Sequence, residues 1–180
     1  MKTLNGVCVG ETSASVSPII VADAGPIIHL DELGCLELLA DFKQVLVPDA
    51  VWLEVERHRP EALLRLPSVL FRQSVPNTLP IIDALAAMYT LHLGEREALA
   101  CCLLQPHSML LTDDTAARLA AKSIGVAAHG TIGLLIRAVR CKLRTKDEVL
   151  QLLGDIQNRT TLHIRPSFLV DVIREVELKL

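Results

Sequence analysis

The stretch PIIVADAGPIIHL, residues 18–30, decides the fold. Its first half is a short β-branched run that ends in Asp23, which is typical of a buried parallel strand at its carboxyl end. Its second half begins at Pro26, whose missing N–H costs little in the first turn of a helix. Apolar residues then recur near helical spacing as far as Ala40. The stretch therefore predicts a strand and a helix with an acidic side chain at their junction.

The same alternation of strand and helix continues along the chain. Further apolar strands are predicted at 44–49, 108–112 and 126–130, and a less regular run at 68–74 is expected to form an edge strand. Helices are predicted at 26–40, 50–58, 81–91, 94–104, 113–125, 131–141, 146–157 and 166–178. Because the strands are apolar on both faces, the pattern predicts an α/β fold, a three-layer sandwich with a short central parallel sheet.

Length and composition predict one domain. A chain of 180 residues with 51% hydrophobic and 22% charged residues suits a single core and excludes disorder over most of its length. Residues 1–17 are small and polar, so we expect a flexible tail followed by a single domain over 18–180 that ends in helices. No stretch resembles a signal peptide or reaches the roughly 20 apolar residues of a membrane span.

Charge, aromatic content and cysteines narrow the function classes. A net charge of −3 argues against a protein that coats nucleic acid electrostatically, and 3% aromatic residues argue against a stacking platform for single strands. Any contact with nucleic acid must therefore be local. The five cysteines lack a zinc-binding spacing, which fits a reducing cytoplasm, and Cys101 and Cys102 are expected to be small core residues.

Carboxylates recur where the predicted strands end and where the following helices begin. Parallel strands bring their carboxyl ends to one edge of the sheet, so we expect these side chains to converge there. Carboxylates in one pocket repel each other and raise each other's pKa unless a divalent cation lies between them, and carboxylate oxygen is the ligand that Mg²⁺ and Mn²⁺ prefer. The candidates are Asp23, Asp49, Glu54, Glu95, Glu97, Asp113 and Asp114.

Each acid also has a simpler interpretation. Helix capping and the helix dipole would account for Asp49, Glu95, Asp113 and Asp114 taken singly. Glu54 would fit a solvated helix face. Asp23 is harder to explain in this way, because it follows the strand directly and precedes Ala-Gly-Pro. The metal-site hypothesis thus depends on the set rather than on any one residue.

Four segments in this order resemble the PIN-domain nucleases, of which the VapC-type toxins are the best-known members. The resemblance runs from about Ile19 to about Leu135 and is carried by IIVADAGPIIHL, VPDAVWLEVE, LGEREALACCLL and LLTDDTAARLAAKSIGV. It implies an acidic catalytic quartet of Asp23, Glu54, Glu95 and Asp114. The metal ligands implied are these four, with Glu97 and Asp113 competing with their neighbours Glu95 and Asp114. The chain departs from the family at Ala24, where many members have Ser or Thr, and it lacks the usual aromatic residue after Asp114.

The resemblance implies a hydrolase, a Mg²⁺- or Mn²⁺-dependent endoribonuclease that leaves a 5′-phosphate, and the toxin half of a toxin–antitoxin pair. The implied partners are RNA, an antitoxin protein and a second copy of the chain in a homodimer. Such an ion lowers the pKa of a bound water and neutralises charge on the scissile phosphate. The departure at Ala24 and the acidic net charge leave open an alternative, a PIN-like module that binds nucleic acid or protein without cleaving.

Further residues near the acids are candidates for substrate binding, each with a structural alternative. Thr112 could orient a metal-bound water or simply be a strand residue, and Arg118 could meet phosphate or pair with Asp114. Gly130 and Thr131 could offer N–H groups to phosphate, although Thr131 also suits an N-cap. His29 and His92 are expected to be packing imidazoles in apolar surroundings rather than metal ligands.

Overall fold

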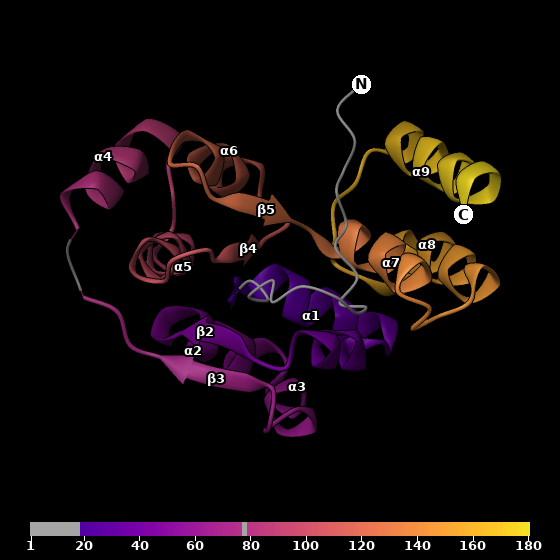
Figure 1. Cartoon of the computed structure of the whole chain (residues 1–180), viewed down its shortest axis with the longest axis horizontal. Coiled ribbons are helices and arrows are strands. Elements are labelled where there is room, and N and C mark those ends of the chain that lie inside the picture. Colours follow the sequence, from indigo (N-terminus) through magenta and orange to yellow (C-terminus); the bar gives the residue numbers. More distant parts are fainter. Residues whose placement is uncertain (1–18, 77–78) are drawn as a thin grey trace, which may run out of the picture.

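The computed structural model describes residues 19–76 and 79–180, so the predicted tail at 1–17 lies outside the described residues. A five-stranded parallel sheet lies between two sets of helices (Figure 1), which confirms the predicted fold class. The strands are β1 (Ile20–Ala22), β2 (Val45–Pro48), β3 (Leu70–Gln73), β4 (Met109–Leu111) and β5 (Ala127–His129). β3 is an edge strand, as the sequence predicted.

The strand order, β3-β2-β1-β4-β5, creates a switch point in the middle of the sheet. The chain moves outward from β1 to β3 and then returns to the other side of β1 to form β4 and β5. In parallel sheets of this kind, ligands bind beyond the carboxyl ends of the strands where the direction of winding reverses. The residues that follow β1 and β4 therefore occupy the position where a site is expected.

Alternate residues of each strand enter two separate cores, because strand side chains point to opposite faces of the sheet. Ile20 and Ala22 lie in one core with α1 (Ala24–Leu33), α7 (Thr131–Arg140), α8 (Lys146–Arg159) and α9 (Pro166–Lys179). Val21 and Leu110 lie in the other with α4 (Pro80–Tyr89), α5 (Leu93–Leu104) and α6 (Thr115–Ser123). Figure 1 shows α4, α5 and α6 on the left and α7, α8 and α9 on the right, with α1 between them.

The helices differ from the prediction at three places. The helix predicted at 26–40 ends at Gly34, whose φ of 73° lies in the left-handed region that favours glycine, and a 3₁₀ helix (Leu36–Phe42) follows. The sequence analysis missed α3 (Pro60–Arg65), which comes directly after α2 (Asp49–His58). The helix predicted at 113–125 begins only at Thr115, with Asp114 as its N-cap.

Two further expectations concern the burial of Cys101 and Cys102 and the length and hydropathy of the helices. Cys101 and Cys102 are buried and free, which confirms that they are core residues. Among the helices of residues 19–76 and 79–180, none is long and apolar enough to cross a bilayer.

Candidate active site

Asp23 lies at the switch point of the sheet. It follows β1, caps the N-terminus of α1 and is only 8% exposed. Its Oδ2 accepts a 2.9 Å hydrogen bond from Thr112 Oγ1. Burial raises the pKa of Asp23 to about 6, and the charges of Glu95 and Glu54 act in the same direction. The hydrogen bonds from Thr112 and from the Ala24 backbone oppose this rise without cancelling it.

Three carboxylates from three different elements line one pocket of about 190 Å³: Asp23 after β1, Glu54 on α2 and Glu95 on α5. Gly94 also lines it. A Cβ built on Gly94 would lie 3.5 Å from Glu54 Oε2 and 3.7 Å from Asp23 Oδ1. A Cβ at this position would contact Val51 as well as both carboxylates, so the absence of a side chain on Gly94 lets the two carboxylates lie close to this turn of α5.

Glu95 combines a capping role with a place in the pocket. Its Oε2 accepts a 2.7 Å hydrogen bond from the backbone N–H of His92, which satisfies the first turn of α5. Burial nevertheless raises the pKa of Glu95, and the nearby charges of Asp114 and Glu54 add to the rise. The capping interpretation and the site hypothesis thus describe the same side chain.

Asp114 lies beside the pocket and is linked to Asp23 through Thr112. The Asp114 backbone N–H donates to Thr112 Oγ1 at 3.2 Å, and that hydroxyl in turn donates to Asp23. Asp114 Oδ1 accepts a 2.7 Å bond from the backbone N–H of Ala117 and caps α6. Within the described residues, Asp114 Oδ2 accepts no hydrogen bond.

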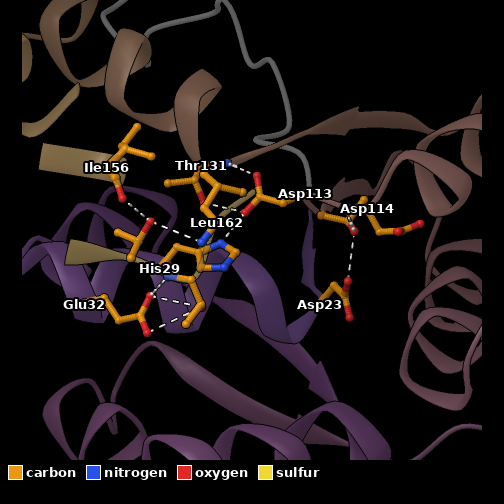
Figure 2. A network of polar contacts seen from close by, with 11 residues as sticks. Asp23, His29, Glu32, Asp113, Asp114, Thr131, Ile156 and Leu162 are labelled. Carbon is orange, nitrogen blue, oxygen red and sulfur yellow. Dashed lines mark hydrogen bonds and ion pairs between the residues drawn. The ribbon is translucent and has the colours of Figure 1, made fainter. Parts of the chain in front are cut away.

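The other acids have partners away from the pocket. Glu97 accepts a 2.7 Å bond from the backbone N–H of Ala50 at the start of α2, and Asp49 pairs with Arg72 and Ser74. Asp113 bonds to Thr131 and His29, and Figure 2 shows it pointing away from Asp114. Of the two ambiguous pairs, Glu95 lines the pocket and Asp114 lies beside it, whereas the side chains of Glu97 and Asp113 bond to other elements.

The predicted substrate-binding residues need correction. Thr112 and Thr131 are 0% exposed and Gly130 is buried, so none of them can touch a bound strand in this structure, and we leave them out of the proposed contacts. Gly130, not Thr131, is the N-cap of α7. Arg118 is exposed, and the expected ion pair with Asp114 does not form among the described residues.

The two histidines behave differently. His29 is buried and hydrogen-bonded, which confirms that it packs in the interior. The same expectation is wrong for His92, which is exposed and lines the acidic pocket. Sequence reasoning also missed Gly94. The one available signal was a glycine inside an otherwise regular helical pattern, which indicates a packing or functional reason.

The pocket fits a hydrated cation better than a bare one. In residues 19–76 and 79–180, no three His, Cys, Asp or Glu side chains lie close enough together to enclose a metal ion. Mg²⁺, however, usually keeps several waters and binds through one or two carboxylates together with substrate phosphates. Neither Lys nor Arg is among the residues that line the pocket, so its carboxylates have no neutralising side chain there.

Comparison with protein-family models matches residues 19–178 to the family described as PIN domain. Neither a curated protein nor a solved structure gives a match.

Because the Asp23 carboxyl is buried, we expect its ionisation to lower the free energy of unfolding in a pH-dependent way. The unfolded chain releases this proton near pH 3.8, whereas the folded protein keeps it until about pH 6. Stability therefore falls as the pH rises through this window. In metal-free buffer at pH 7.5, Asp23→Asn should raise the free energy of unfolding by about 3 kcal/mol, because a pKa difference of one pH unit corresponds to about 1.4 kcal/mol. Near pH 4 it should change it little.

Urea unfolding in EDTA at both pH values measures this effect. Asp171→Asn, at an exposed position on α9, serves as the control and should be neutral at both. If Asp23→Asn raised the free energy of unfolding equally at pH 4 and pH 7.5, ionisation of the buried Asp23 carboxyl would not be the cause of the gain, and the prediction would be contradicted.

Proposed function

We propose, on the premise that this chain belongs to the PIN domain family, that it is a Mg²⁺- or Mn²⁺-dependent endoribonuclease. PIN domains are generally nucleases and typically use divalent metals, so the family supports nucleic-acid hydrolysis. The observation that carries the proposal is the pocket that Asp23, Glu54 and Glu95 line together beside Gly94.

In this proposal Asp23, Glu54 and Glu95 hold the cation, directly or through its waters, and Asp114 adds charge beside them. A bound divalent cation supplies an activated water and neutralises charge on the scissile phosphate. The chain itself fixes the orientation of the ligands. Thr112 holds Asp23 Oδ2, while Asp23 Oδ1 faces the space beside Gly94.

The reaction requires no covalent nucleophile from the protein. Burial raises the pKa of Cys101 to about 11 and that of Cys102 to about 12, so neither thiol is a nucleophile at neutral pH. Arg118 is the remaining candidate for contact with the substrate backbone. It is exposed on α6, one turn after Asp114, and no carboxylate within the described residues pairs with it.

The second candidate function is a PIN-like module that binds nucleic acid without cleaving it. Ala24, which stands next to Asp23, is buried and carries no hydroxyl, and the carboxylates do not form an enclosed ion site among the described residues. RNA binding by the wild-type chain without Mn²⁺-dependent cleavage would favour this module over the nuclease.

The pair Glu95 and Glu97 gives the sharpest test of the nuclease proposal. Glu95→Gln removes a charge from the pocket and should lower Mn²⁺-dependent cleavage of single-stranded RNA at least about 100-fold. This is the upper end of the loss in activity that follows when a residue that orients a metal ligand is mutated. Glu97→Gln keeps an oxygen that can accept from Ala50 and should stay within a few-fold of the wild type.

Cleavage is measured on an end-labelled RNA with Mn²⁺ and with EDTA, after circular dichroism has shown that both variants are folded. Equal losses in the two variants, or cleavage that persists in EDTA, would count against the proposed site.

We also propose that the chain is the toxin half of a toxin–antitoxin pair, is cytoplasmic, acts as a homodimer and binds a small antitoxin protein. This context is supported by the resemblance of its motifs to VapC-type toxins. Expression in a bacterial host should arrest growth, and Asp23→Asn should relieve the arrest, because it removes a proposed ligand. Growth that is equally inhibited by both forms would separate toxicity from the acidic pocket.

A further inference from the structure

We propose that Asp113 is a positioning residue for the acidic pocket. In this inference, a clamp formed by Asp113, His29, Thr131 and Gly130 holds the end of β4 in the geometry that presents Thr112 and Asp114 to the site. The inference rests on the proposed function because it assumes that the pocket binds a cation. The hydrogen bonds of the clamp are present in the structure without a cation.

Both oxygens of Asp113 are engaged. Oδ1 accepts from the Thr131 backbone N–H at 2.7 Å, and Oδ2 accepts from Thr131 Oγ1 at 2.6 Å and from His29 Nδ1 at 2.8 Å. The Asp113 side chain is only 13% exposed. These bonds join the end of β4 to α1 and to the N-terminus of α7 (Figure 2), where the helix dipole favours a carboxylate.

Two glycines make room for this arrangement. A Cβ on Gly130 would lie 2.4 Å from Asp113 Oδ1, a separation that real Cβ atoms do not adopt. A Cβ on Gly25 would lie 3.6 Å from Asp113 Oδ2 and 3.5 Å from His29 Cε1. Gly130 has a φ of −111°, which any residue can adopt, so space rather than backbone conformation requires a glycine there.

The clamp acts on the pocket through the two neighbours of Asp113 in the chain. Thr112 donates to Asp23 and accepts from the Asp114 backbone, while Asp114 caps α6. Successive residues in extended backbone point to opposite sides, and Figure 2 shows Asp113 and Asp114 doing so. Holding Asp113 toward His29 and Thr131 therefore holds Thr112 and Asp114 toward the pocket.

Asp113 is not a further ligand in this scheme. Both of its oxygens accept hydrogen bonds from His29 and Thr131, whereas Asp114 Oδ2 accepts none within the described residues. Its partners also keep another carboxylate out of a pocket whose charges already repel each other.

The test disturbs the clamp without changing Asp113 itself. Gly130→Ala displaces the Asp113 carboxylate by contact, and Thr131→Val removes one hydroxyl donor while preserving shape. Thr131→Ser keeps the hydroxyl and is the conservative rescue. Gly154→Ala, at an exposed α8 position whose Cβ would meet nothing within 4 Å, is the matched control.

Two measurements are made on each full-length variant. Calorimetric titration with Mn²⁺ should show about tenfold weaker binding for Gly130→Ala and Thr131→Val, the scale for residues that orient metal ligands. Thr131→Ser and Gly154→Ala should match the wild type. In EDTA, hydrogen exchange of the Ala117 amide, which donates to Asp114 Oδ1, should be faster only in the first two variants.

The outcomes separate this inference from the proposed function. Failure of the wild type to bind Mn²⁺ would overturn the metal-dependent function, and amide exchange alone would then decide whether the clamp orients Asp114. If Mn²⁺ binds normally to Gly130→Ala and Thr131→Val, the positioning role is overturned, whether or not the Ala117 amide exchanges faster.

Discussion

The burial of the Asp23 carboxylate without a cationic partner is the constraint on which the rest of the site depends. Asp31, which is as deeply buried as Asp23, pairs with the guanidinium groups of Arg59 and Arg65. Within residues 19–76 and 79–180, Asp23 accepts hydrogen bonds only from the neutral Thr112 hydroxyl and the Ala24 backbone, and the charged side chains beside it in the pocket are those of Glu54 and Glu95. A solvent cation would supply the partner that this arrangement lacks, and this is the reason for proposing an ion-dependent activity.

The topology of the sheet produces this concentration of charge. β1 and β4 end side by side at the switch point, and the N-terminal turns of α5 and α6 face the same edge. Closely spaced acids then take different roles. Glu95 and Glu97 are two residues apart on a helix and so lie about 200° apart around its axis, while Asp113 and Asp114 alternate in extended backbone. In each pair, one acid lies at the site and the other holds neighbouring elements together.

Much of the fold could be predicted from the sequence, because apolar strands bounded by helices leave few alternatives to a parallel sheet. The strand ends, and with them the position of Asp23, follow from the same pattern. The break at Gly34 and the short helix α3 were not predicted, although each has a local signal: a glycine in the left-handed conformation ends α1, and Pro60 begins α3. The choice between Asp113 and Asp114 could not be made either, because a shift of one residue exchanges them. The burial of Thr131 is a tertiary feature with no local signal, and the glycine at position 94 does not by itself indicate which carboxylates lie against it.

The most direct measurement is an NMR titration of the Asp23 side-chain carboxyl carbon, first in EDTA and then with millimolar Mg²⁺. The account predicts a midpoint at about pH 6 without the ion and a clear fall in that midpoint when Mg²⁺ is added, because a bound cation favours the ionised carboxylate. A midpoint that Mg²⁺ leaves unchanged would show that the buried charge has no affinity for the ion, and the central claim would be contradicted.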